Sequence, residues 1–127
     1  MVKYTYEERK LTSRADDLIV KSPTDKRSVA VLEILTREYS IDTIGRSVDE
    51  IKKQGVTSLV IDITRFPKVA LITNAAFLFG AFEMGGRLKT RYVGINKEEL
   101  EKYDERSFEH LLNQRTYNTI DEAVESL

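Results

Sequence analysis

The residues able to do acid–base or nucleophilic chemistry are few and scattered along the chain. There is one histidine, His110, beside Glu109 in the segment SFEHLLNQ, and there is no cysteine. One histidine without a neighbouring nucleophile supports neither a catalytic triad nor a zinc site with three protein nitrogens. The lack of cysteine removes thiolate nucleophiles, thiolate metal sites and disulfides. We therefore expect no enzymatic activity, no metal and no other cofactor.

Asp62 is the acid whose position best suits ligand binding. It lies near the end of the apolar run TSLVIDI, and α/β sheets bind ligands at the carboxyl ends of their central strands. Pairing with Glu83 or Lys68 would allow acid–base work, but sequence spacing does not establish that these groups meet. We favour the interpretation that Asp62 accepts backbone N–H groups from the loop that follows it.

The segment around Asp62 predicts a strand, a loop, a helix and a second strand. Residues 57–63 are nearly continuously apolar, the helix follows from Asn74, Gly85–Gly86 ends it, and residues 88–95 form the second strand. A helix that joins two parallel strands must pack on the sheet, and the connection is right-handed. This unit predicts an α/β fold.

The preceding segment extends the same pattern. Residues 28–36 predict a strand, and the alternation predicts Val29, Val31 and Glu33 on one face with Ala30, Leu32 and Ile34 on the other. An amphipathic helix follows, with Ile44, Val48 and Ile51 on its inner face and Gly55 as its stop.

The two ends of the chain complete a single domain. Residues 1–28 predict a short edge strand or arm, and residues 29–127 an α/β core. Asn96 and Thr119 are expected to cap helices near the C-terminal end, with Glu99 and Glu122 three residues later. The expected fold is a mixed β-sheet with helices packed against it.

The helix from Asn74 to Met84 is apolar on more than one side, because eight of its eleven residues are apolar. Two explanations fit. Either the helix lies between the sheet and the C-terminal helices, or its second side is a surface for a protein partner or for self-association. The candidate surface comprises Lys68, Val69, Thr73, Asn74, Phe77, Phe79 and Phe82.

Charge and hydropathy narrow the class of partner. The 127 residues include 20 basic and 21 acidic side chains, mixed along the chain, so nucleic acid is not an expected partner. No apolar run is long enough to span a membrane, and the first residues do not form a signal peptide. We expect a cytoplasmic protein.

From Val29 onward the chain resembles the STAS domain, the fold of bacterial anti-sigma-factor antagonists. The resemblance rests on four segments, VAVLEILTREYSIDTIGRSVDEI, SLVIDIT, GGRLKTRYVGIN and RTYNTIDEAVESL. It implies a cytoplasmic regulatory module without enzymatic activity that binds a protein partner, such as a regulatory kinase-like or sigma-pathway protein, or a second copy of itself.

One family feature does not carry over. STAS antagonists carry a serine at the start of the helix after the central strand, and a partner kinase phosphorylates it. The matching positions here are near Lys68 and Val69, and the stretch from Lys68 to Leu71 has no hydroxyl. Thr64 and Thr73 flank it, and are more simply read as a strand end and a helix cap. The resemblance then implies a module without the usual phosphoswitch. As the alternative, domains of the same general architecture carry apolar ligands or lipids under their helices.

Overall fold

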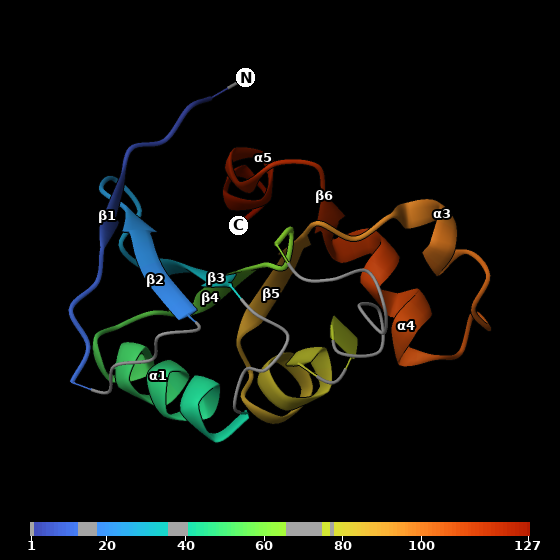
Figure 1. The fold of residues 1–127 in the computed structure, drawn as a ribbon, viewed down its shortest axis with the longest axis horizontal. Helices are drawn as coiled ribbons and strands as arrows, with labels where there is room; N and C mark the ends of the chain where they lie inside the picture. The colour runs from blue at the N-terminus through green and yellow to red at the C-terminus, as the bar shows by residue number, and fades with distance from the viewer. Residues whose placement is uncertain (1, 13–17, 36–40, 66–74, 77) are drawn as a thin grey trace.

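The computed structural model describes residues 2–12, 18–35, 41–65, 75–76 and 78–127. Within these ranges, six strands form one sheet in the order β1-β2-β3-β4-β5-β6 (Figure 1). The strands are β1 (Tyr6–Glu8), β2 (Leu18–Pro23), β3 (Val29–Ile34), β4 (Ser58–Asp62), β5 (Lys89–Val93) and β6 (Thr116–Tyr117).

The sheet is mixed, as the sequence predicts. β2 is antiparallel to both of its neighbours, β1 and β3, and the strands from β3 to β6 are parallel to one another. In the parallel part, Val31 of β3 lies beside Val60 of β4, which lies beside Arg91 of β5. The parallel connections need crossovers, and helices supply them.

The helical segments cover both faces of the sheet. They are α1 (Ile41–Lys53), the π-helical segment η1 (Gly80–Gly85), α3 (Lys97–Leu100), α4 (Phe108–Leu111), the 3₁₀ segment η2 (Leu112–Arg115) and α5 (Ile120–Glu125). Residues 75–76 and 78–79 are helical and lead into η1. In Figure 1, α1 and the helix that contains η1 lie below the sheet and α5 lies above it. The fold is therefore α/β.

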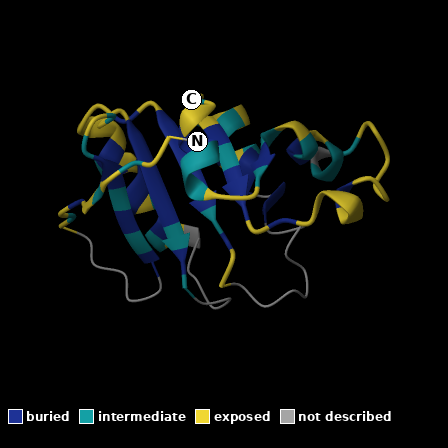
Figure 2. Ribbon diagram, turned by 90° about the horizontal axis from the view of Figure 1, so that it is seen from above, coloured by how far each residue is buried: buried dark blue, intermediate teal, exposed yellow. Residues whose placement is uncertain are grey.

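The two faces of the sheet hold separate cores. On β3, Ala30, Leu32 and Ile34 belong to the larger cluster, whereas Val29 and Val31 belong to the smaller one, which confirms the predicted alternation. We call the side toward α1 and η1 the first face and the side toward α5 the second face. The central strands are mostly buried between them (Figure 2).

α1 forms as its sequence predicts. Ile44, Val48 and Ile51 are buried on the first face, and the chain leaves the helix at Gly55, whose φ is 96°. Glycine adopts this left-handed conformation without the steric cost that a side chain would bring.

The turn after η1 differs from the expected glycine cap. The left-handed residue there is Arg87, with φ 57°, whereas Gly86 has φ −92°. Gly86 is needed for another reason, because a Cβ at this position would lie 2.8 Å from the Phe82 carbonyl oxygen. Close approach of the backbone, and not a positive φ, accounts for the glycine.

The predicted caps of the C-terminal helices are present. The Asn96 side chain accepts the Glu98 N–H at 2.9 Å, and the Thr119 hydroxyl accepts the Glu122 N–H at 3.2 Å. Among the described residues, no helix is both long enough and apolar enough to cross a membrane.

Candidate functional site

Asp62 is held by its own loop. Its Oδ1 accepts the Thr64 N–H at 2.9 Å and also binds the Thr64 hydroxyl. This confirms the interpretation that Asp62 accepts a backbone N–H from the segment after the strand. Glu83 lies elsewhere, since it pairs with Arg115 at 2.6 Å. The acid–base pairing with Glu83 is therefore absent, and Lys68 lies outside the described residues.

Gly94, which directly follows β5, packs closely against the same end of β4. Its φ is 104°, and a Cβ there would lie 2.7 Å from the Thr64 backbone nitrogen. The Ile63 N–H donates to the Val93 carbonyl at 3.0 Å, so the two strand ends are bound together just beyond the sheet. From Asp62 to Thr64 the chain therefore makes a tight turn against the end of β5.

His110 belongs to the capped first turn of α4. It is half-buried on α4, and its backbone N–H donates to the capping Ser107 hydroxyl at 3.3 Å. The described residues contain no group of three or more histidine, cysteine or acidic side chains suited to a metal ion.

Two residues of the predicted interaction surface are buried. Phe79 is 1% exposed and Phe82 9% exposed. The Arg115 guanidinium, at the end of η2, lies over the Phe79 ring, 4.9 Å from its centre. Of the two explanations for the apolar helix, the burial of these two rings favours the one in which the helix is enclosed within the fold. The other five positions, Lys68, Val69, Thr73, Asn74 and Phe77, lie outside the described residues.

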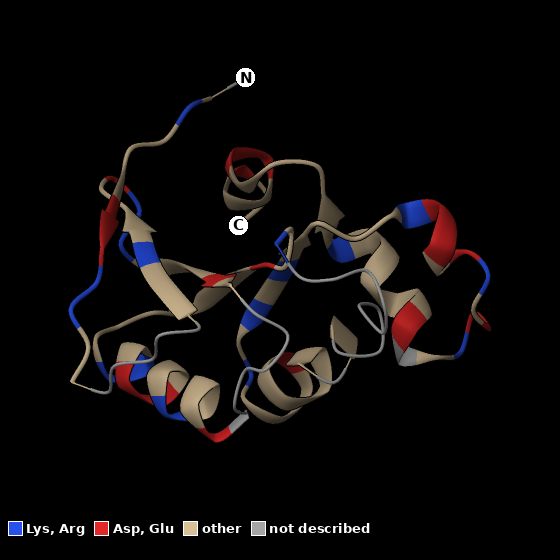
Figure 3. Ribbon diagram, in the orientation of Figure 1, with Lys and Arg blue, Asp and Glu red and all other residues tan. Residues whose placement is uncertain are grey.

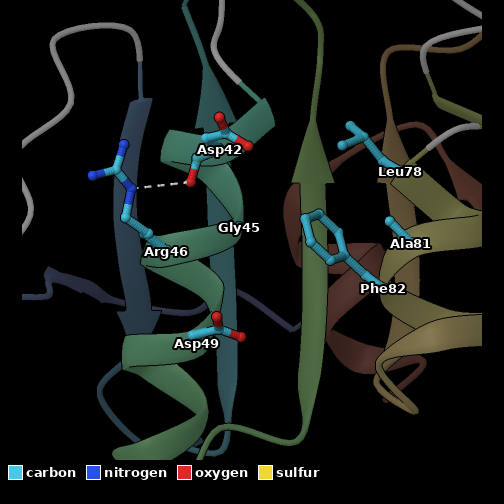
Figure 4. Close-up of a pocket in the computed structure, with 7 residues that line it drawn as sticks. All are labelled: Asp42, Gly45, Arg46, Asp49, Leu78, Ala81 and Phe82. Atoms are coloured by element: carbon cyan, nitrogen blue, oxygen red, sulfur yellow. Dashed lines mark hydrogen bonds between the residues drawn. The ribbon is translucent and has the colours of Figure 1, made fainter.

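A groove remains open between α1 and the helix that contains η1. Its volume is about 530 Å³. Figure 4 shows its residues, with Leu78, Ala81 and Phe82 pointing from one helix toward the gap. The other wall is α1, which contributes Asp42, Gly45, Arg46 and Asp49.

The groove has an apolar floor and a charged rim. Leu78 and Phe82 are almost fully buried beneath it, whereas Ala81, Asp42 and Asp49 are exposed. Both acidic and basic positions occur along α1 (Figure 3). Among the described residues, no ion pair joins Arg46 to either aspartate, and its Nε donates to the Asp42 backbone carbonyl at 3.4 Å. All three charged side chains are exposed.

Sequence reasoning missed the α1 wall of this groove. The available signal was Gly45, a glycine inside an amphipathic helix, where glycine costs up to about 1 kcal/mol relative to alanine. Among the described residues, a Cβ at Gly45 would meet nothing within 4 Å, so packing against them does not require the glycine.

A buried polar cluster lies on the other side of η1. Glu83 pairs with Arg115 and accepts the Thr90 N–H at 3.3 Å, and Arg115 also donates to the Leu111 carbonyl at 3.0 Å. Tyr92, fully buried on β5, has its pKa raised by burial, although the neighbouring Thr90 hydroxyl acts in the opposite direction. Within the described residues, neither hydroxyl completes a hydrogen bond of good geometry. The cluster ties η1 to η2 and β5.

Comparisons with known proteins add no relative. No family model matches this chain, and searches of curated proteins and of solved structures each gave no match.

Proposed function

We propose that this chain is a regulatory protein-interaction module without enzymatic activity, similar in architecture to STAS domains and lacking their usual phosphoswitch. Its partner is a protein that binds the face formed by α1 and η1. The resemblance suggests a regulatory kinase-like or sigma-pathway protein as the kind of partner.

The groove between α1 and η1 is the observation that most supports this proposal. Its floor of Leu78 and Phe82 suits an apolar side chain, and its rim carries charges of both signs. Protein interfaces commonly combine an apolar centre with a polar rim. The strand end at Asp62, by contrast, is bonded through Oδ1 to its own loop at Thr64.

The carriage of an apolar ligand is the second candidate. The groove volume of about 530 Å³ falls within the range of roughly 300–1,000 Å³ typical of small-molecule sites. Three charged residues on the rim, Asp42, Arg46 and Asp49, make the groove a better match for a protein than for a lipid chain.

Mass spectrometry of the purified chain separates these two functions. A native spectrum that shows only the mass of the protein, or multiples of it, supports the interaction module. A noncovalent adduct that is present in the native spectrum and lost on denaturation would support ligand carriage, and its mass would indicate the class of ligand.

Crosslinking in cells that contain the chain then tests the interacting face. Ala81→Glu adds a charge at the exposed edge of the groove, and Asn118→Glu adds the same charge at an exposed position before α5. We expect partners crosslinked to the wild type and to Asn118→Glu to be lost with Ala81→Glu. A partner set that is the same for all three would contradict a role for this face.

A further inference from the structure

The groove-facing side of α1 has a definite residue order. Asp42, Gly45, Arg46 and Asp49 follow the three- and four-residue spacing of one helical face. Lys53, exposed at the end of the helix, lies one further turn along the same side. From start to end, this face therefore has an acidic group, a gap, a basic group, an acidic group and a basic group.

The groove is open because its facing positions are small. Gly45 on α1 and Ala81 on η1 both line it, and a Cβ at Gly45 would meet no atom of the described residues within 4 Å. Glycine in a helix allows another backbone to approach closely. A second helix could lie in this groove alongside α1.

The charges of α1 complement those of an antiparallel copy of α1. When two copies overlap along the whole helix, Arg46 of one faces Asp49 of the other, and Asp42 faces Lys53. Each pairing occurs twice by symmetry, as in an interface that uses the same surface on both subunits. In the parallel order, each charge would face its own equivalent, and the like charges would repel.

We propose that the groove is occupied by α1 of a second copy of this chain, in an antiparallel arrangement with Arg46–Asp49 ion pairs across the two-fold axis. The proposal rests on the proposed interaction function, and it names a second copy as a partner. Each Gly45 then lies where the two helices approach closely, and Leu78 and Phe82 lie beneath the contact.

Charge exchange at two positions tests this arrangement. The variants are Arg46→Asp, Asp49→Arg and the double variant with both changes. The mass of each purified protein in solution is measured over a dilution series by light scattering after gel filtration, and circular dichroism confirms that each variant folds. Both side chains are exposed, so the fold is expected to survive.

We expect the wild type to dimerise and each single variant to dimerise roughly tenfold or more weakly, because like charges then meet across the axis. The double variant restores the dimer, since the pair is exchanged and remains opposite in sign. An equimolar mixture of the two single variants also forms a dimer, because one copy supplies two acids and the other two bases.

Two results would overturn the proposal. One is a wild type that stays monomeric throughout the series, and the other is a dimer that neither single variant weakens. If the wild type is a monomer and its crosslinked cellular partners are lost with Ala81→Glu, the dimer proposal is wrong but the proposed interaction function is supported. The wild type could also form a dimer with the expected charge dependence while Ala81→Glu changes no other crosslinked partner. The interaction function would then be self-association alone.

Discussion

The two faces of the sheet are closed by different kinds of contact. The first face is covered by α1 and the helix that contains η1, and it holds the larger cluster of buried apolar residues. The second face is covered by α5, and the partly buried Tyr4 and Tyr6 of the N-terminal segment pack against its smaller cluster. The first face has the larger apolar core beside the Glu83–Arg115 ion pair, whereas the polar contacts of the second face join the two ends of the chain.

Two tyrosines make those polar contacts. The Tyr6 hydroxyl donates to Asp121 at 2.6 Å, and the Tyr4 hydroxyl donates to Glu125, so both reach α5. Lys21 lies over the Tyr6 ring, 5.0 Å from its centre, and pairs with Glu33. Hydrogen bonds and ion pairs depend on pH and salt, so these tyrosine contacts should respond to solution conditions more strongly than the buried apolar side chains of either face.

Replacement of Phe79 by alanine should have the largest effect, because it removes a ring buried at the first face. We expect unfolding in urea to show a loss of about 3–5 kcal/mol, as is usual for buried aromatic residues. Met84→Ala, at a side chain that is 60% exposed, is the control and should change stability by less than about 0.5 kcal/mol. Similar small losses for both variants would mean that the ring is not part of the core.

Val31→Ala should have a smaller effect at the second face. Val31 is fully buried on β3, and the change removes two carbon atoms, so we expect a loss of about 2 kcal/mol in the same urea measurement. A loss as large as that of Phe79→Ala would remove the contrast between the two cores.

Tyr6→Phe should isolate the polar contribution to the second face. It removes the hydrogen bond to Asp121 and keeps the ring, so we expect a loss of about 0.5–1.5 kcal/mol near neutral pH. Burial, followed by that hydrogen bond, raises the pKa of Tyr6 above its ordinary value.

The same variant has a pH signature. Because the folded chain holds the phenol proton more tightly, the Tyr6 contribution is complete below about pH 10 and falls as the pH rises above it. The stability gap between wild type and Tyr6→Phe should therefore narrow in alkaline urea titrations. A gap that stays constant above that pH would contradict the assigned role of the hydroxyl.

Tyr92→Phe should have the smallest effect, although Tyr92 is the more buried of the two tyrosines. Its hydroxyl lacks a hydrogen bond of good geometry within the described residues, so its removal should leave stability unchanged or raise it slightly. A clear loss of stability would show that the hydroxyl has a partner, such as an ordered water, and a crystal structure would reveal it.

Much of the fold follows from local sequence pattern. The alternation in β3 and the spacing of Ile44, Val48 and Ile51 in α1 predict which side chains are buried. Each pattern depends only on which side of a single strand or helix packs inward. The order of the elements then gives the parallel crossovers.

The candidate site could be predicted only in part. The apolar helix implies a cover for its second side, but the sequence does not indicate that Arg115 provides it over Phe79. Likewise, the groove exists only because two helices far apart in the sequence lie beside each other. The contacts of Tyr4 and Tyr6 with α5 are equally hidden, since no local pattern connects them.

The hydrogen bonds of Tyr4 and Tyr6 to α5 also affect how the chain folds. The Tyr6–Asp121 hydrogen bond joins residues 115 positions apart, so its formation closes almost the whole chain into a loop. Contacts of this kind form slowly and are expected after the sheet has assembled. In hydrogen exchange, the short strand β1 should therefore open more often than β3 and β4 and exchange its amides first. The last part of the molecule to fold would be the first to open.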